Sequence, residues 1–323
     1  MHRRAELDRG TTGVAAGLCL AVLGGCASTA PPTPVQNPAA AQAIESTRSS
    51  VRATAVWLAR GVDSWFGDRP FQEAGSVTDG RLSVSLLHRQ DESLDADVRF
   101  NARFKLPNVE KWGYLFVGRD NPREVITDQP AAFTARERLT PESTQDRSFF
   151  AGIGREFDDA VDFRLGFRGG LKPYAQARYR HAWQTGEDDL VEFRQTLFWS
   201  SDDRVGTTAA LSVEHAFSPV LVGRWLSAAT VTQVSEGLEW QTRLGAHRSL
   251  GRQRQLSVEA LMSAQRRTGV DVGDVGLQLR WEQPVHRDWL LGEVLIGHFW
   301  PRPSPDLPRD RAWALGVGLK LKF

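Results

Sequence analysis

The chain has 323 residues, with 40 basic and 39 acidic side chains, two cysteines and eleven tryptophans. Balanced charge excludes a strongly basic nucleic-acid-binding protein, and two cysteines exclude a disulfide scaffold. A mean hydropathy of −0.36 excludes a bundle of membrane-spanning helices, because each span needs about 20 mostly apolar residues.

The first 25 residues are typical of a bacterial signal peptide. Arg3 and Arg4 precede an apolar run over residues 14–23, which is too short to cross a bilayer. The segment LGGC that ends at Cys26 resembles the lipobox of bacterial lipoproteins. That resemblance implies cleavage before Cys26 and lipid attachment to it by the lipoprotein maturation machinery. An ordinary secretory signal or an uncleaved anchor remains the alternative.

A Pro- and Ala-rich segment over residues 26–42 predicts a semi-extended linker. The next segment, residues 43–68, predicts one amphipathic helix in the periplasm. Its apolar stripe consists of Ile44, Val51, Ala55, Leu58, Val62 and Trp65, and Gly67 is a plausible stop. This stripe requires a partner, either the rest of the protein, the lipid interface, or another envelope protein that docks there.

Residues 79–323 alternate between apolar and polar side chains. In the last segment Trp313, Leu315, Val317, Leu319, Leu321 and Phe323 share one face. Such strands fit either a soluble sandwich or an all-β transmembrane antiparallel barrel. Three features favour the barrel. The apolar faces are uninterrupted, the opposite face of nearly every strand carries charge, and the last strand ends on Phe323. Phe323 resembles the insertion signal that the barrel-insertion machinery of the outer membrane recognises.

About fourteen strands are predicted, with twelve as the alternative because the third is short. Their ranges are 81–90, 96–106, 112–119, 147–157, 161–169, 173–183, 190–200, 206–217, 220–232, 238–247, 254–265, 273–283, 288–300 and 311–323. An even number of strands places the start of the first strand and the end of the last strand on the same side of the membrane, in the periplasm. The segment 120–146 is then either a surface loop or an inward plug.

Eight tryptophans fall near the predicted strand ends, where aromatic side chains meet both water and lipid. We expect Trp112, Trp183, Trp281 and Trp289 at the periplasmic interface and Trp199, Trp240, Trp300 and Trp313 at the outer interface. Outer-membrane lipid is therefore an expected partner of this chain.

The polar faces predict a charged lumen. Its members are Arg164, Arg168, Arg178, Arg180, Glu192, Arg194, Glu214, Arg224, Glu239, Arg243, Glu259, Arg280, Glu282, Glu293, Lys320 and Lys322. One interpretation is the lining of a pore that filters small solutes. The other is a set of cross-strand ion pairs that fill and stiffen a narrow lumen.

No motif for catalysis, cofactor or metal binding is recognised, so the sequence predicts no cofactor and no enzyme activity. The histidines His88, His181, His215, His247, His286 and His298 lack ligand spacing. The enzymatic alternative is a phospholipase or lipid A deacylase barrel, which would use a Ser–His pair. Alternation, however, places Ser212 and Glu214 on one face and His215 on the other.

The segments VDSWFGD, PYAQARYRHAW, FRQTLFW, VLVGRW and LRWEQPVHRDWLLGE resemble an uncharacterised family of proteobacterial outer-membrane barrels. The resemblance runs from about residue 45 to the end and implies location and fold only. Together these features predict an outer-membrane barrel lipoprotein that is structural or a narrow solute channel.

Overall fold

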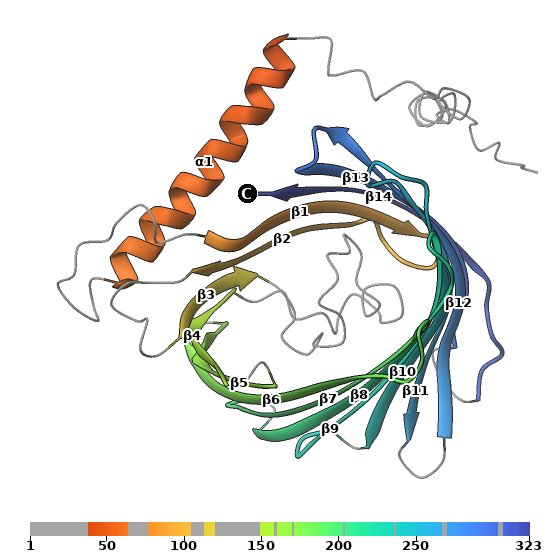
Figure 1. Ribbon diagram of the computed structural model, residues 1–323. Coiled ribbons are helices and arrows are strands. Elements are labelled where there is room, and N and C mark those ends of the chain that lie inside the picture. The colour runs from red at the N-terminus through yellow and green to blue at the C-terminus, as the bar shows by residue number, and fades with distance from the viewer. Residues whose placement is uncertain are drawn as a thin grey trace, which may run out of the picture.

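A closed β-barrel forms most of the structure. A computed structural model describes residues 38–63, 77–104, 113–119, 149–157, 160–169, 171–202, 204–235, 237–266, 270–302 and 306–323. Within them, one helix and fourteen strands are present, and every strand pairs antiparallel with its neighbours. The strands follow one another round the barrel in chain order until β1 closes on β14 (Figure 1). The predicted antiparallel barrel of fourteen strands is confirmed, and the alternative of twelve strands is not.

Each predicted strand overlaps an observed one, and the bounds differ by only a few residues. The elements are α1 (Pro38–Asp63), β1 (Val77–Arg89), β2 (Asp95–Phe104), β3 (Tyr114–Arg119), β4 (Phe149–Phe157), β5 (Val161–Arg168), β6 (Lys172–Gln184), β7 (Asp189–Ser200), β8 (Arg204–Ser218), β9 (Leu221–Thr232), β10 (Leu238–Ser249), β11 (Gln255–Arg266), β12 (Val270–His286), β13 (Leu290–Trp300) and β14 (Ala312–Lys322). The ambiguous segment 120–146 lies outside the described residues.

Period-two alternation separates the two faces of the barrel wall. In β14, Trp313 and Leu319 are 56% and 48% exposed on the outer face, whereas Ala314 and Lys320 are buried on the inner face. The cross-strand register carries this separation all round the barrel, because partners on neighbouring strands share a face. The outer face is therefore apolar and the inner face polar.

Helix α1 begins about five residues earlier than predicted. It spans Pro38–Asp63 where the sequence predicts residues 43–68, and the expected stop at Gly67 lies outside the described residues. Proline is favoured at the first helical position, and the alanines after Pro38 are strong helix formers. Part of the predicted linker is therefore helical. No helix in the described part of the chain is long and apolar enough to cross a bilayer.

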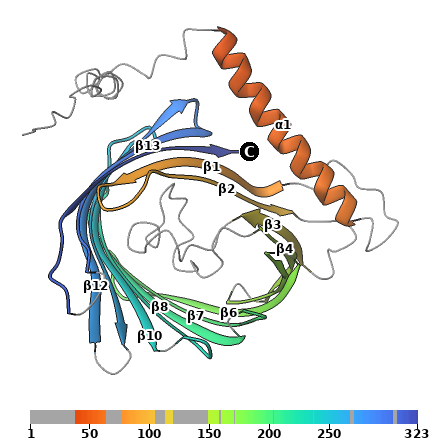
Figure 2. The same cartoon turned by 180° about the vertical axis from the view of Figure 1, so that it is seen from behind.

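Helix α1 lies on the outside of the barrel, beside β1 and the C-terminus (Figures 1 and 2). Ile44 packs on the cluster of Trp289, Leu290 and Leu321. Arg48 stacks 4.8 Å from the centre of the Trp289 ring. The docking face thus includes a charged residue that the sequence places away from the apolar stripe. We call this end of the barrel the helix end and the opposite one the far end.

The terminal Phe323 closes the seam between the first and last strands. Its backbone N–H donates to the Gly80 carbonyl at 3.0 Å, and its ring stacks on Phe100 with centroids 5.9 Å apart. A Cβ at Gly80 would lie 2.6 Å from the Phe323 ring. Glycine is therefore required at position 80, because only its bare backbone leaves room for the ring.

Candidate functional site

The inner face of the barrel carries the candidate site. Alternation and register place the charges expected in the lumen on inward faces: Arg164, Arg178, Arg180, Glu192, Arg194, Glu214, Arg224, Glu239, Arg243, Glu259, Arg280, Glu282 and Glu293. These charges lie in two kinds of surroundings. One part of the wall is packed, and another is exposed.

On β10–β14 the inward charges form an ion network, which we define as His247, Glu259, Arg280, Glu282, Glu293 and Lys320. Glu282 and Glu293 lie directly opposite each other on neighbouring strands. The Lys320 ammonium bridges them, since it lies 2.7 Å from Glu293 Oε2 and also contacts Glu282. A cation between two carboxylates removes their repulsion.

The network continues through a second cation. Arg280 lies 3.9 Å from both Glu259 Oε1 and Glu293 Oε1, and Gln278 donates to Glu259. His247 Nε2 lies 4.0 Å from Glu259 Oε1. Glu293 is only 1% exposed, so water screens these pairs little. Removing one member would leave a buried charge without compensation, which is costly.

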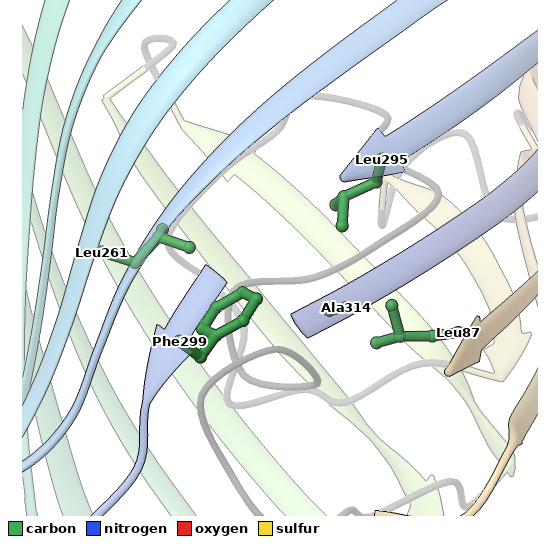
Figure 3. Packing of buried hydrophobic residues seen from close by; sticks show 5 residues of the cluster. All are labelled: Leu87, Leu261, Leu295, Phe299 and Ala314. Carbon is green, nitrogen blue, oxygen red and sulfur yellow. The ribbon is translucent and has the colours of Figure 1, made fainter. Parts of the chain in front are cut away.

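An apolar cluster packs next to this network inside the barrel. Leu87, Leu261, Leu295, Phe299 and Ala314 come from β1, β11, β13 and β14 and gather on the inward face (Figure 3). All are at most 5% exposed. The inward faces of β11–β14 and β1 are therefore packed like the core of a soluble protein, and we call them the filled sector.

Arg89 connects the far end of the filled sector to charged neighbours. Its guanidinium lies 5.1 Å from the centre of the Phe299 ring. It also donates to Asp91 at 2.8 Å and to Asp274 at 3.0 Å. Arg89, a buried cation at the end of β1, thus covers the apolar cluster.

The inward faces of β5–β7 differ, and we call them the basic sector. They carry six basic side chains against two acidic ones, a net excess of four positive charges. The basic residues are Arg164, Arg168, Lys172, Arg178, Arg180 and Arg194, and the acidic ones are Asp162 and Glu192.

Within the basic sector, two arginines oppose each other. Arg180 of β6 and Arg194 of β7 are direct cross-strand partners. Glu192 accepts a hydrogen bond from Arg194 at 2.7 Å, and Asp162 accepts one from Arg164 at 2.8 Å. Arg180 is exposed toward the lumen, in contrast to the buried cations of the filled sector.

An aromatic wall adjoins the basic sector. Tyr114, Phe116, Phe150 and Tyr174 form an inward cluster on β3, β4 and β6. The Tyr114 hydroxyl donates to Asp162 at 2.5 Å and accepts from Arg164 Nε at 2.9 Å. Arg103 stacks 3.8 Å from the centre of the Tyr114 ring. Tyrosine thus holds the guanidinium of Arg164 in place through its hydroxyl.

The remaining predicted charges lie between these two sectors. Glu214 of β8 and Arg224 of β9 are opposite each other and form an ion pair. Glu239 and Arg243 face inward on β10. Ser212 shares the inward face of Glu214, whereas His215 faces outward with its Nδ1 2.8 Å from Asp189 Oδ1. The described residues contain no group of three or more His, Cys, Asp or Glu that could hold a metal ion.

Six of the described tryptophans lie on the outer face near the two ends of the barrel, whereas Trp225 lies partway along β9. Trp183 and Trp281 lie toward the helix end, whereas Trp199, Trp240, Trp300 and Trp313 lie toward the far end. Trp289 is 6% exposed because α1 covers it. Trp112 and Cys26 lie outside the described residues.

The sequence did not single out Tyr114 or Asp162. Tyr114 belongs to the six-residue strand β3, whose apolar residues occupy both faces, so no alternation marks it. Asp162 does alternate with Val161 and Phe163, and its inward position was readable from that pattern. What the pattern lacks is the pairing of β3 and β5 with β4, which lies between them and brings the two side chains together.

No family model matches this chain, and no curated protein matches it. Among solved structures, the outer membrane channel DcaP of Acinetobacter baumannii is 10% identical with a TM-score of 0.48, covering 79% of this chain and 99% of that one. In vitro folded OmpT, an outer membrane protein of Vibrio cholerae, is 10% identical with a TM-score of 0.42, covering 76% and 96%. A bacterial polysaccharide outer membrane secretin is 13% identical with a TM-score of 0.43, covering 77% and 99%.

Proposed function

We propose that the chain is an outer-membrane β-barrel lipoprotein whose lumen forms a narrow passage for small solutes. The apolar outer face supports the membrane location. Leu165, Leu197 and Leu244 lie within strands, yet they are 58%, 55% and 61% exposed. A soluble protein rarely exposes apolar surface on every side, whereas a bilayer covers it.

The lengths of the connections support an orientation with the helix end in the periplasm. At that end the connections range from two residues, 219–220 between β8 and β9, to nine, 105–113 between β2 and β3. At the far end five connections have three to five residues, and two are longer, 120–148 and 301–311. Outer-membrane barrels have short periplasmic turns and longer outer loops. This orientation also places a lipid on Cys26 at the inner leaflet.

The unequal packing of the lumen carries the channel proposal. The filled sector blocks one side with the ion network and the apolar cluster, while Arg180 of the basic sector stays exposed to the lumen. A purely structural barrel would gain stability from packing on every side. A passage along the exposed wall explains why charge is retained there.

Single-channel recording in planar bilayers tests this function. The purified, folded protein is expected to give discrete conductance steps smaller than those of a wide porin. Heat-modifiable migration on gels verifies that the protein is folded, and folded protein without steps would overturn the channel. Labelling with palmitate, and its loss in Cys26→Ser, tests the lipid anchor separately.

A further inference from the structure

The contact between helix α1 and the β12–β13 turn leaves several buried polar atoms without a partner. It consists of Glu45, Arg48, His286, Arg287 and Trp289, and we call these five residues the helix–turn junction. Four buried nitrogens of the junction lack a hydrogen bond, namely Arg48 Nε, Trp289 Nε1 and both ring nitrogens of His286. His286 and Trp289 are only 7% and 6% exposed. Because a buried donor without an acceptor is costly, this group of atoms indicates a missing ligand.

The junction lies at the helix end, on the outer face of the barrel wall. Leu290 and Leu321 are cross-strand partners on that face, and Ile44 of α1 packs on them. Helix α1 lies outside the barrel, beside the C-terminus (Figures 1 and 2). Toward the middle of β14, Val317 and Leu319 continue the same face and are 46% and 48% exposed. The junction therefore adjoins an apolar wall at the level where interface aromatics meet lipid headgroups.

Arginines supply the charge of the junction. Among the described residues, the Arg48 guanidinium forms no hydrogen bond or ion pair. Arg287 is 64% exposed and pairs with Glu45 at 2.8 Å, which leaves most of its five N–H donors open. Arg52 follows Arg48 by one helical turn, and the turn also contains the exposed Asp288. Three basic side chains thus stand against two acidic ones.

The unpaired atoms and the charge select the same class of ligand. N–H donors require an oxygen acceptor, and guanidinium groups bind phosphate oxygens with paired hydrogen bonds. A phosphate drawn in between α1 and the turn would satisfy donors of Arg48, His286 and Trp289. Acyl chains of the same molecule would cover Val317 and Leu319 on the neighbouring wall. A soluble phosphate would leave that wall uncovered, so the two features together favour a phospholipid.

We propose that the helix–turn junction binds the headgroup of an anionic phospholipid. Arg48 and Arg287 hold the phosphodiester, and the acyl chains lie on the outer face of β14. The inference rests on the proposed membrane location and does not depend on the channel. In the proposed orientation this lipid belongs to the periplasmic leaflet. The bound headgroup fills the contact between α1 and the turn, and it thereby helps to hold the helix on the barrel.

Native mass spectrometry of the full-length protein tests the lipid site. The purified protein in detergent is titrated with phosphatidylglycerol or with phosphatidylcholine that carries identical acyl chains. Phosphatidylglycerol should bind more tightly, because its headgroup has a net negative charge. The double variant R48Q/R287Q should weaken this binding about tenfold or more, which corresponds to about 1.4 kcal/mol. Binding of phosphatidylcholine should change little in the same variant.

Two variants serve as controls, and heat-modifiable migration first verifies that each is folded. Arg252→Gln removes a cation from another turn at the helix end, where the backbone φ of 49° resembles the 53° of Arg287. Binding of phosphatidylglycerol should stay unchanged in this variant. Glu45→Gln removes the ion-pair partner of Arg287 but keeps both arginines, so binding should stay the same or strengthen. Excess inorganic phosphate should displace little of the lipid, because it lacks acyl chains.

The outcomes separate the lipid site from its alternatives. Equal binding of the two lipids, or an equal loss in R48Q/R287Q and Arg252→Gln, would overturn the site. A loss in Glu45→Gln as large as in R48Q/R287Q would show that helix docking sets the binding, which would also refute it. Displacement by inorganic phosphate would identify a soluble phosphate as the ligand instead of a lipid. Folded protein without conductance steps would overturn the channel and leave the lipid site intact.

Discussion

The filled sector and the basic sector are built from the same strand pattern, yet they have opposite physical character. On β12–β14, Lys320 lies between Glu282 and Glu293. On β6 and β7, Arg180 faces Arg194. The order of signs across neighbouring strands therefore decides whether inward charges that face each other attract or repel.

The largest expected effect breaks the ion network. Lys320→Met leaves Glu282 and Glu293 opposed and without their shared cation, and Lys320 is only 5% exposed. The loss should be about 3–5 kcal/mol, which is typical of a broken buried ion pair. Urea unfolding in detergent micelles measures it. As a matched control beside the basic sector, Asp202→Asn breaks the exposed ion pair with Lys172 and should cost less than about 1 kcal/mol; similar losses in both variants would refute the difference between the sectors.

The apolar cluster gives the next largest effect. Leu295 is completely buried inside the barrel, so Leu295→Ala should cost about 2–5 kcal/mol by leaving a cavity. When samples are heated to increasing temperatures before electrophoresis, the temperature at which the folded band disappears should fall accordingly. Leu244→Ala on the outer face provides the comparison, and an equal fall there would show that the filled sector is not packed.

A smaller effect is expected where the aromatic wall meets the basic sector. Tyr114→Phe keeps the ring but removes the hydroxyl that bonds Asp162 and Arg164. Because Asp162 still pairs with Arg164, the cost should be about 1–2 kcal/mol. The urea midpoint measures this loss of stability. A variant with unchanged stability would contradict the positioning role of Tyr114.

The smallest effect belongs to an exposed ion pair of the basic sector. Lys172 and Asp202 lie 2.9 Å apart, and their side chains are 52% and 46% exposed. Lys172→Gln should change stability by at most about 0.5 kcal/mol, because water screens such pairs. The same urea titration checks this value, and a loss comparable to that of Lys320→Met would show that exposure does not separate the two sectors.

The strands were predictable because each has one continuous apolar face. In β10, Leu238, Trp240 and Leu244 share the outer face, and the observed strand ends within two residues of the predicted one. In β12 the prediction was too short, because register shifts opposite Met262 and near Pro284 interrupt the alternation at its ends. Alternation is a local property, so one sequence is enough to detect it.

The pairing of the charges was not predictable, because it depends on how far each strand is shifted against the next. One residue of slip would separate Lys320 from Glu293 and Arg180 from Arg194. Docking of α1 on the rest of the protein was one of the expected alternatives, but the apolar stripe gave no sign that Arg48 would stack on Trp289. Such contacts join distant parts of the chain, and no local period encodes them.

The contact between α1 and the last strand has a consequence for the order of assembly. Ile44 belongs to the first described element and Leu321 to the last, and they pack in one cluster. A growing chain produces the helix long before β14 exists, so the helix has no complete docking surface until the final strand is in place. Docking of the helix therefore depends on completion of the barrel. An unfinished barrel leaves the helix undocked, and a finished barrel holds it against Trp289.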